Sequence, residues 1–277
     1  LGIVQRQTGA MQEALATYER AIAIDRALGN GDAEAKTVNS LAIVHAEQGR
    51  FDEARRHFEV ALALSRELGD RRQEGVVLIN LGSLNIEQAR FAIGREQCEA
   101  ALAIHRDTGE RVEEGNALIN LGLLDQSQGR VEEARNKLGA ALAIAREAGN
   151  RRSEGVVLGM LGALEREQGR IEHAQAHYDQ ALSIHRAVGN RRYAGMVLAQ
   201  LGDLLTQQGR LEDARALLAE GEGQLRAVDE KLELVSLLCL RGQLELAEGE
   251  PARAQASLAQ ADSDARALDL GADSKLW

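Results

Sequence analysis

The sequence contains few aromatic residues, almost no proline and no excess of positive charge. Aromatic residues make up 3% of the 277 residues, and a single proline, Pro251, stands against 28 glycines. Apolar residues nevertheless reach 44%, so alanine and leucine must supply most of any core. Strong helix formers dominate the sequence over the β-branched and aromatic residues that favour strands. The composition therefore predicts an all-α protein.

The charge balance argues against nucleic acid and anionic membranes as partners. The chain carries 33 Lys and Arg against 43 Asp and Glu, a net charge of −10. Non-specific attraction to a phosphate backbone needs a basic surface, which this balance does not favour. No apolar run approaches the roughly 20 residues of a membrane-spanning helix. We therefore expect a soluble protein that binds neither nucleic acid nor a membrane.

Cysteine is nearly absent as well. The two cysteines, Cys98 and Cys239, are too few for a disulfide framework, which favours a reduced, cytoplasmic setting. Cys98 is expected to act as a small buried hydrophobe. The chain begins with Leu1 and not with Met, within a helix-like segment, so we expect any leader or neighbouring domain to lie outside this sequence.

The main positive feature of the sequence is an internal repeat of 40 residues. One glycine series follows this step, with Ala89 in its single gap, and comprises Gly9, Gly49, Gly129, Gly169, Gly209 and Gly249. A second series lies midway and comprises Gly29, Gly69, Gly109, Gly149 and Gly189. Because glycine favours the left-handed residue that ends many helices, two glycines per repeat indicate two helix ends. Each repeat is therefore predicted to be a helical hairpin.

The segment 72–88 illustrates the predicted first helix of a hairpin. Asp70 is its expected N-cap, and Asn150 and Asn190 stand in the equivalent places. Its core face is predicted to hold Val77, Leu78, Leu81 and Leu84.

The predicted second helix is illustrated by the segment that begins after Gly129-Arg130. Glu132 and Glu133 in its first turn complement the helix dipole. The residues predicted to point inward are Ala134, Leu138, Ala141, Leu142 and Ile144. In one hairpin, Ala89, Gly94 and Cys98 replace Gly, Ala and a larger apolar residue, and we expect locally looser packing there.

This pattern resembles the tetratricopeptide repeat. The Leu-Gly pairs of its first helix are Leu81-Gly82, Leu121-Gly122, Leu161-Gly162 and Leu201-Gly202, and Ala134 and Ala141 match its second helix. The unit is longer than the common 34 residues and is similar to the long repeats of kinesin light chains and many bacterial signalling proteins. The resemblance implies a right-handed superhelical solenoid of antiparallel helical hairpins, with the first helices on its concave side.

The repeat register predicts a single solenoid over residues 1–277. Its parts are a truncated first repeat at about 1–30, repeats at 31–70, 71–110, 111–150, 151–190 and 191–228, and a divergent C-terminal repeat and tail at 229–277. The truncated first hairpin leaves Leu1, Ile3 and Val4 without a stacking partner, so a homodimer through this terminal repeat is one alternative.

A helical projection places one stripe of each first helix opposite its core side. In this family an Asn directly before the Leu-Gly pair often binds the backbone of a bound peptide, and Asn80 and Asn120 occupy that place. An amide suits this role because it both donates and accepts hydrogen bonds. The predicted peptide-binding groove comprises Ser40, Asn80, Glu87, Asn116, Asn120, Met160, Gln200 and Asp203. The alternative is that these asparagines are solvated or cap a neighbouring helix.

Arginines recur near the start of each first helix. Arg71, Arg111, Arg151 and Arg191 have the charge to meet carboxylates of a ligand. The favoured interpretation is inter-repeat pairing, with Glu74, Glu114 and Glu154. Surface pairs of this kind contribute little individually.

No residue combination predicts catalysis, a metal site or a cofactor. His173 and His177 lie one helical turn apart, but no acidic or cysteine partner recurs at ligand spacing, so solvated histidines are favoured. His105 and His185 occupy equivalent repeat positions, which duplication explains. The glycines end helices or ease packing and form no phosphate-binding loop. We expect no enzyme activity from this array.

The leading functional hypothesis is a non-catalytic scaffold that holds a peptide or protein segment in its concave groove. The family resemblance implies the regulatory or sensor part of a larger bacterial signalling protein. The alternative is a structural spacer or self-association module with no groove ligand. A third hypothesis, RNA recognition by helical repeats, is opposed by the net charge and by a groove stripe without basic or aromatic residues.

Overall fold

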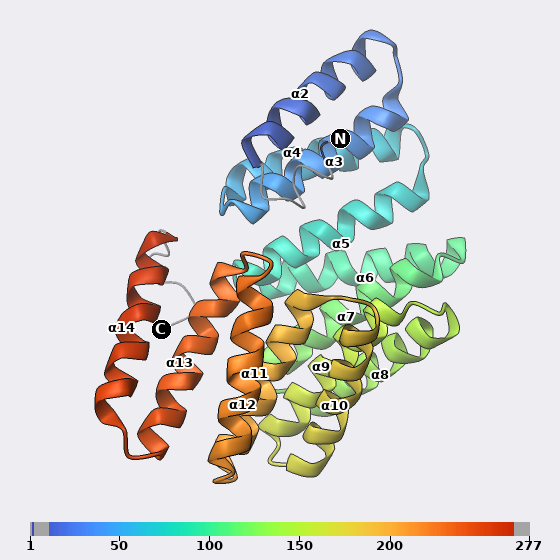
Figure 1. Ribbon diagram of the computed structural model, residues 1–277. Coiled ribbons are helices and arrows are strands. Elements are labelled where there is room, and N and C mark those ends of the chain that lie inside the picture. Colours follow the sequence, from blue (N-terminus) through green and yellow to red (C-terminus); the bar gives the residue numbers. More distant parts are fainter. Residues whose placement is uncertain (1, 3–10, 269–277) are drawn as a thin grey trace. The chain divides into compact units, whose positions relative to one another are not determined.

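The computed structural model describes Gly2 and residues 11–268. Leu1, Ile3, Val4 and Gly9, on which parts of the predicted first repeat and homodimer depend, lie outside the described residues. The described helices, labelled as in Figure 1, are α2 (Met11–Ala27), α3 (Gly31–Glu47), α4 (Phe51–Glu67), α5 (Arg71–Glu87), α6 (Phe91–Thr108), α7 (Arg111–Ser127), α8 (Val131–Glu147), α9 (Arg151–Glu167), α10 (Ile171–Ala187), α11 (Arg191–Gln207), α12 (Leu211–Arg226), α13 (Lys231–Ala247) and α14 (Pro251–Ala267). They form two compact units, Leu1–Ile144 and Ala145–Trp277.

The turns between helices confirm the glycine-based prediction of helix ends. Gly129 and Gly149 have φ angles of 72° and 63°, in the left-handed region. After α8, the Gly149 N–H bonds the Arg146 carbonyl and the Asn150 N–H bonds the Ala145 carbonyl, which satisfies carbonyls at the helix end. Ala89, with φ of 58°, takes the same conformation in the gap of the glycine series.

The starts of the first helices follow the predicted caps in two of three cases. The Asp70 carboxylate accepts a hydrogen bond from the Gln73 N–H at 2.9 Å, and the Asn150 side chain accepts one from Ser153 at 3.1 Å. Asn190 stands at the N-cap position of α11, but its side chain makes no capping bond. Because the Asp70 cap precedes Arg71, α5 begins one residue earlier than predicted.

The Leu-Gly pair explains how the two helices of a hairpin approach each other. A Cβ atom placed on Gly162 in α9 would lie 2.7 Å from the ring of Tyr178 in α10. A Cβ atom placed on Gly122 in α7 would likewise lie 3.0 Å from the side chain of Leu138 in α8. Glycine therefore makes the recess that a large side chain of the second helix fills, and the all-α array of antiparallel hairpins with a 40-residue period is confirmed.

The α5–α6 hairpin corrects the expectation of looser packing. A Cβ atom on Gly94 would lie 2.9 Å from the Gly82 carbonyl oxygen, and one on Gly82 would lie 2.4 Å from the Cys98 sulfur. Two facing glycines thus bring the backbones together, so the small residues tighten this hairpin. Cys98 is fully buried as predicted, and burial raises the pKa of its thiol to about 12.

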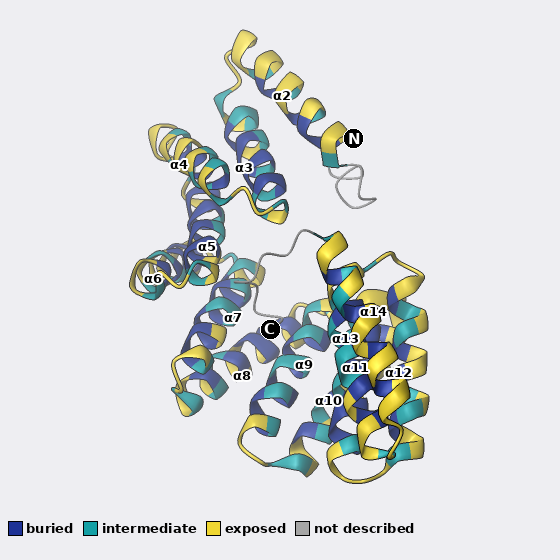
Figure 2. Ribbon diagram, turned by 90° about the vertical axis from the view of Figure 1, so that its left-hand side faces the viewer, coloured by how far each residue is buried: buried dark blue, intermediate teal, exposed yellow. Residues whose placement is uncertain are grey.

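The first helices are buried more completely than the second helices (Figure 2). Ten residues of α5 are buried, against four of α4. This difference arises because successive first helices also contact one another, α3 with α5 and α5 with α7 in one unit, and α9 with α11 and α11 with α13 in the other. The first helices therefore form the inner layer of each unit.

A buried polar residue stands three positions after the Leu-Gly glycine in several hairpins. Asp125 is fully buried, and its carboxylate accepts hydrogen bonds from Arg95 at 2.5 Å, from Arg130 at 2.7 Å and from Lys137. These partners connect α6, α7 and α8, so one carboxylate joins consecutive hairpins. A buried carboxylate is tolerated only when it is paired in this way.

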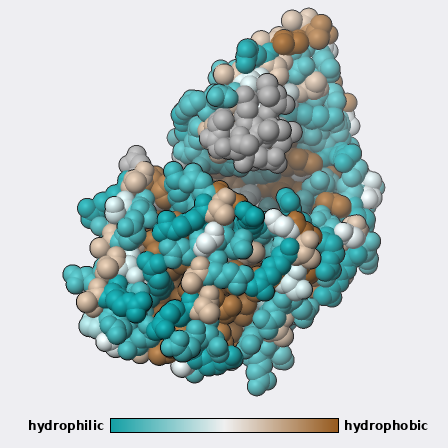
Figure 3. All heavy atoms as spheres, in the orientation of Figure 1, coloured by the Kyte–Doolittle hydropathy of each residue, from teal (hydrophilic) through white to brown (hydrophobic). Residues whose placement is uncertain are grey.

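The outer surface is hydrophilic over most of the face shown in Figure 3, as expected for a chain with 27% charged residues. Among the described helices, none has both the length and the apolar composition needed to cross a bilayer.

Candidate functional site

In the first unit, α5 and α7 enclose a hollow on the inner layer. Its volume is about 310 Å³, and we call it the amide hollow. Its lining residues are Val76, Ile79, Asn80 and Ser83 of α5 and Glu113, Asn116, Ile119 and Asn120 of α7. The structure thus brings together three of the predicted groove residues, all of them asparagines.

The asparagines of the amide hollow are only partly engaged by the protein. The Asn80 amide donates to the Asn39 oxygen at 2.9 Å, and the Asn116 amide donates to the Glu113 carboxylate at 2.9 Å. The Asn120 amide faces the Cys98 thiol and lowers its pKa, against the larger effect of burial. The side-chain oxygens of Asn80 and Asn116 accept no hydrogen bond from the described residues. They therefore remain available to backbone N–H groups of a ligand.

Two other predicted groove residues of the first unit do not line this hollow. The Ser40 hydroxyl donates to the Lys36 carbonyl of its own helix at 3.0 Å. Glu87 is exposed at the last position of α5.

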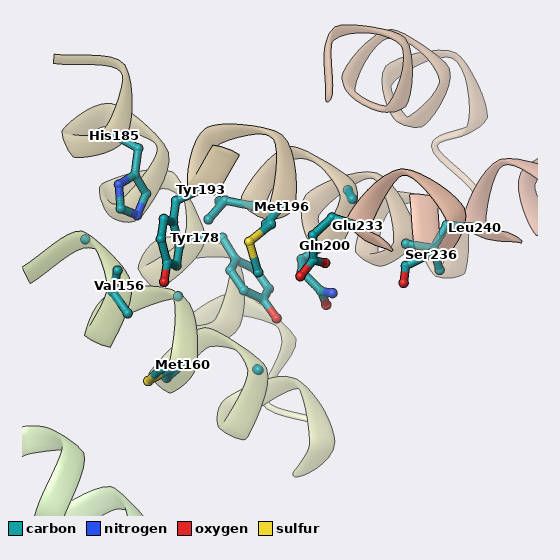
Figure 4. A pocket seen from close by; sticks show the side chains of 15 residues that line it. Val156, Met160, Tyr178, His185, Tyr193, Met196, Gln200, Glu233, Ser236 and Leu240 are labelled. Carbon is teal, nitrogen blue, oxygen red and sulfur yellow. The ribbon is translucent and has the colours of Figure 1, made fainter. Parts of the chain in front are cut away.

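In the second unit, α9, α10, α11 and α13 enclose a pocket of about 220 Å³ (Figure 4). We call it the methionine pocket. Its labelled lining residues are Val156, Met160, Tyr178, His185, Tyr193, Met196, Gln200, Glu233, Ser236 and Leu240. Met160 and Gln200, both predicted groove residues, lie here, and they occupy the same repeat position as Asn80 and Asn120.

Asp203 was also predicted to belong to the groove, but the structure places it elsewhere. It is 7% exposed, its carboxylate pairs with Arg166 at 2.6 Å, and it accepts a hydrogen bond from Gln207 at 3.0 Å. Asp203 is not among the residues that line the methionine pocket. The ion pair between Asp203 and Arg166 joins α11 to α9.

Two buried ring side chains form the floor of the methionine pocket. Tyr178 is 1% exposed, and burial raises its pKa to about 12. His185 is fully buried, and burial lowers its pKa, so the imidazole is neutral near pH 7. The His185 ring stacks on Tyr193, with 5.3 Å between ring centroids. This part of the pocket is therefore uncharged and rigidly packed.

Glu233 of α13 is the acidic residue of the methionine pocket. Its side chain is 25% exposed, and its nearest cation, the Arg192 guanidinium, lies 3.9 Å away. The same guanidinium bonds Glu230 at 2.6 Å and lies over the Tyr193 ring at 5.7 Å. Burial raises the pKa of Glu233, although Arg192 opposes this effect.

The predicted groove stripe did not include Glu233 or Tyr193. Glu233 and Tyr193 share a repeat position with Glu113, which lines the amide hollow. This position lies three residues before the next stripe residue and therefore on the same helix face. Extending the predicted stripe by one turn toward the helix start would have found it.

Arg71, Arg111 and Arg151 pair with the predicted glutamates, but each does so within its own helix, and the bridge to the preceding repeat comes from Arg66, Arg106 and Arg146. Glu74 accepts from Arg71 at 2.5 Å and from Arg66 of the preceding helix at 2.9 Å. Glu114 binds Arg106 and Arg111 in the same way, and Glu154 binds Arg146 and Arg151. Burial alone would raise the pKa of Glu114, but the two arginines outweigh it and hold the pKa below its ordinary value. In α11 the glutamate position holds Ala194.

The described residues contain no cluster of three or more His, Cys, Asp or Glu side chains that could hold a metal ion. His173 is exposed and His177 is partly buried, one turn apart on α10.

The chain matches two family models. The model of the MalT-like TPR region covers residues 75–270, and that of the tetratricopeptide repeat covers residues 1–67. Among curated proteins, none matches the chain.

Several solved structures share the fold. The apo form of RapI aligns over 98% of this chain and 97% of its own, with a TM-score of 0.76 and 14% identity. The Rap conjugation gene regulator of plasmid pLS20, in complex with the Phr* peptide, aligns over 99% and 75%, with a TM-score of 0.69 and 16% identity. A signal transduction ATPase with a tetratricopeptide repeat sensor, from Pyrococcus horikoshii, aligns over 97% and 42%, with a TM-score of 0.69 and 15% identity. At these identities the similarity shows the fold alone.

Proposed function

The chain belongs to the tetratricopeptide repeat family and contains a MalT-like TPR region, as its Leu-Gly and alanine pattern predicted. From this premise we propose that it binds an extended peptide segment as a non-catalytic scaffold. The peptide occupies the inner layer of first helices, where its backbone meets the amide hollow.

The observation that carries this proposal is the convergence of Asn80, Asn116 and Asn120 on one open hollow. An extended peptide presents alternating N–H and C=O groups, and each primary amide can serve both. The partial use of Asn80 and Asn116 by Asn39 and Glu113 fixes their rotamers before a ligand arrives. Such preorganisation reduces the entropy lost on binding.

The similar structures support this proposal by analogy. The Rap regulator of pLS20 was solved with a peptide, and the Pyrococcus protein carries its repeats as the sensor of a signal transduction ATPase. We place this chain in the same role, as the sensor or regulatory part of a larger bacterial signalling protein in the cytoplasm.

Selection from a phage-displayed library of random dodecapeptides on the full chain tests the proposal. Enriched peptides are synthesised with a fluorescein label, and their Kd is measured by fluorescence polarisation for the wild type and for the Asn80→Ala/Asn120→Ala variant. We expect the variant to bind about tenfold more weakly, because two amide hydrogen bonds are lost at about 0.5–1.5 kcal/mol each.

Asn136→Ala/Gln180→Ala is the matched control, because both residues are exposed on second helices, away from the hollow. It should bind with the affinity of the wild type. Peptides that bind both variants equally would move recognition to another surface, and a selection without enrichment would contradict the proposed function.

A further inference from the structure

Glu233 places an incompletely paired carboxylate in a pocket whose other lining residues are uncharged. Apart from the contact of 3.9 Å with Arg192, no ion pair or hydrogen bond engages this carboxylate among the described residues. Arg192 itself is held by Glu230 at 2.6 Å, so most of its charge is already compensated. The negative charge in the pocket exceeds the positive charge available to it.

The other walls of the methionine pocket suit an aliphatic chain that ends in a cation. Met160 and Met196 offer flexible thioethers that adapt to an unbranched chain. Tyr178 and Tyr193 present aromatic rings, and a ring face attracts a cation. Gln200 of α11 and Glu233 of α13 both line this pocket, and their side-chain oxygens can accept hydrogen bonds from N–H groups.

The structure already contains one example of such recognition at this pocket. The Arg192 guanidinium lies over the Tyr193 ring at 5.7 Å and pairs with Glu230, which is an aromatic and acidic environment for a basic side chain. Glu233, three residues after the N-cap Glu230 of α13, repeats this acidic element and reaches only the same guanidinium, at 3.9 Å.

We propose that the methionine pocket takes a lysine or arginine side chain of the bound peptide, with its aliphatic stem against Met160, Met196 and Tyr193 and its cationic end at Glu233 and Gln200. This inference rests on the proposed function and assigns a residue preference to its second unit. A purely apolar side chain fits the walls less well energetically, because it would cover the Glu233 carboxylate without pairing it.

The probe for this inference is a positional-scanning library of fluorescein-labelled heptapeptides. The central residue is fixed as Lys, Arg, norleucine or Glu, and the other positions are random. Fluorescence polarisation with the full chain gives a Kd for each pool. Norleucine is the informative comparison, because it keeps the aliphatic stem of lysine and lacks the ammonium group.

We expect the Lys and Arg pools to bind about fivefold more tightly than the norleucine pool and more tightly still than the Glu pool. In the Glu233→Gln variant, the difference between Lys and norleucine should fall below about twofold. Glu172→Gln removes an equal charge from an exposed position on α10, and it should retain the full preference. Circular dichroism melting curves establish that each variant is folded.

The outcomes separate the two proposals. Pools that bind without a basic preference, or with a preference that Glu233→Gln leaves intact, overturn the pocket assignment and leave the scaffold function standing. If no pool binds, both are overturned. A preference that disappears only in Glu233→Gln supports the assignment.

Discussion

The amide hollow of the first unit and the methionine pocket of the second unit are built from the same repeat positions. Asn80 and Asn120 in one correspond to Met160 and Gln200 in the other, on helices of equal length. The first hollow therefore offers hydrogen-bonding groups, and the second offers sulfur, aromatic and apolar surface. The difference teaches that the repeat keeps its architecture while its surface chemistry changes, because the Leu-Gly pairs that bring the helices together line neither the amide hollow nor the methionine pocket.

The architectural residues are the same in both units. Ala141 in the first unit and Ala181 in the second are 2% and 0% exposed, and both lie where a second helix packs closely on its neighbours. The repeat position of the fully buried Asp125 is less uniform, since the second unit has buried glutamates there at Glu165 and Glu245 but an apolar residue at Leu205. An apolar side chain and a carboxylate are both accommodated at this buried position, provided that the carboxylate is paired.

The largest expected effect comes from a charge at one of these alanines. Ala141→Glu and Ala181→Glu should each lower the free energy of unfolding by about 3–5 kcal/mol, because the carboxylate has no partner in the helix seam. Urea unfolding followed by circular dichroism measures the loss. Since repeats depend mainly on their neighbours, hydrogen exchange should rise first in the unit that carries the change.

An exposed alanine provides the control for this experiment. Ala143→Glu, two residues after Ala141 on the outer side of α8, should change stability by less than about 0.5 kcal/mol. Equal damage at Ala143 and Ala141 would contradict the packing described for the second helices.

An intermediate effect is expected from acidification. Burial lowers the pKa of both His105 and His185 below the ordinary 6.5. For His105, Glu113, Glu110 and the Gly75 backbone oppose this effect and Arg72 adds to it. For His185, the Gly155 backbone opposes it and Arg152 adds to it. The unfolded chain therefore binds these protons at a higher pH than the folded chain. Stability should be complete above pH 6.5 and should fall as the pH drops from there toward the lower, folded-state values.

Urea midpoints at pH 7.5 and pH 5.5 measure this loss, and His105→Gln and His185→Gln assign it to the two units. Each variant should lose less stability between the two pH values than the wild type does. His173→Gln is the control, since His173 is exposed. An unchanged loss in both buried-histidine variants would assign the acid sensitivity to other groups.

The smallest expected effect on stability comes from substitutions of the residues that line the two pockets. Asn120→Ala in the amide hollow and Met160→Ala in the methionine pocket should each shift stability by less than about 1 kcal/mol, because both side chains are only partly buried. Thermal melting is sufficient to measure this. Strong destabilisation by Asn120→Ala would show that this asparagine supports the fold and is not a groove residue.

The sequence predicted the hairpins well because their signals are local. A glycine every 20 residues marks a left-handed helix end, and a Leu-Gly pair marks a close approach, whatever the rest of the chain does. The predicted proximity of Asn80, Asn116 and Asn120 has the same local origin, since one helical period places them on the face that lines the amide hollow, and their role in binding stays a prediction.

The remaining features depend on contacts between helices that a periodicity does not contain. Asp203 lies on the predicted stripe, but its carboxylate pairs with Arg166 of α9 and does not line the methionine pocket. Gly94 suggested a loose hairpin, yet it faces Gly82 and tightens the packing. Glu233 became a candidate only because the packing of α13 on α11 places it in the same pocket as Gln200.

The clamps of Arg66, Glu74 and Arg71, and of Arg106, Glu114 and Arg111, join consecutive hairpins through the same three side chains. Because neighbouring joints share this chemistry from α4 to α9, excision or duplication of one 40-residue module there creates a new junction from parts that already fit. Unequal recombination can therefore lengthen or shorten such an array in whole modules, and each added module brings its own groove residues to be altered by later mutation.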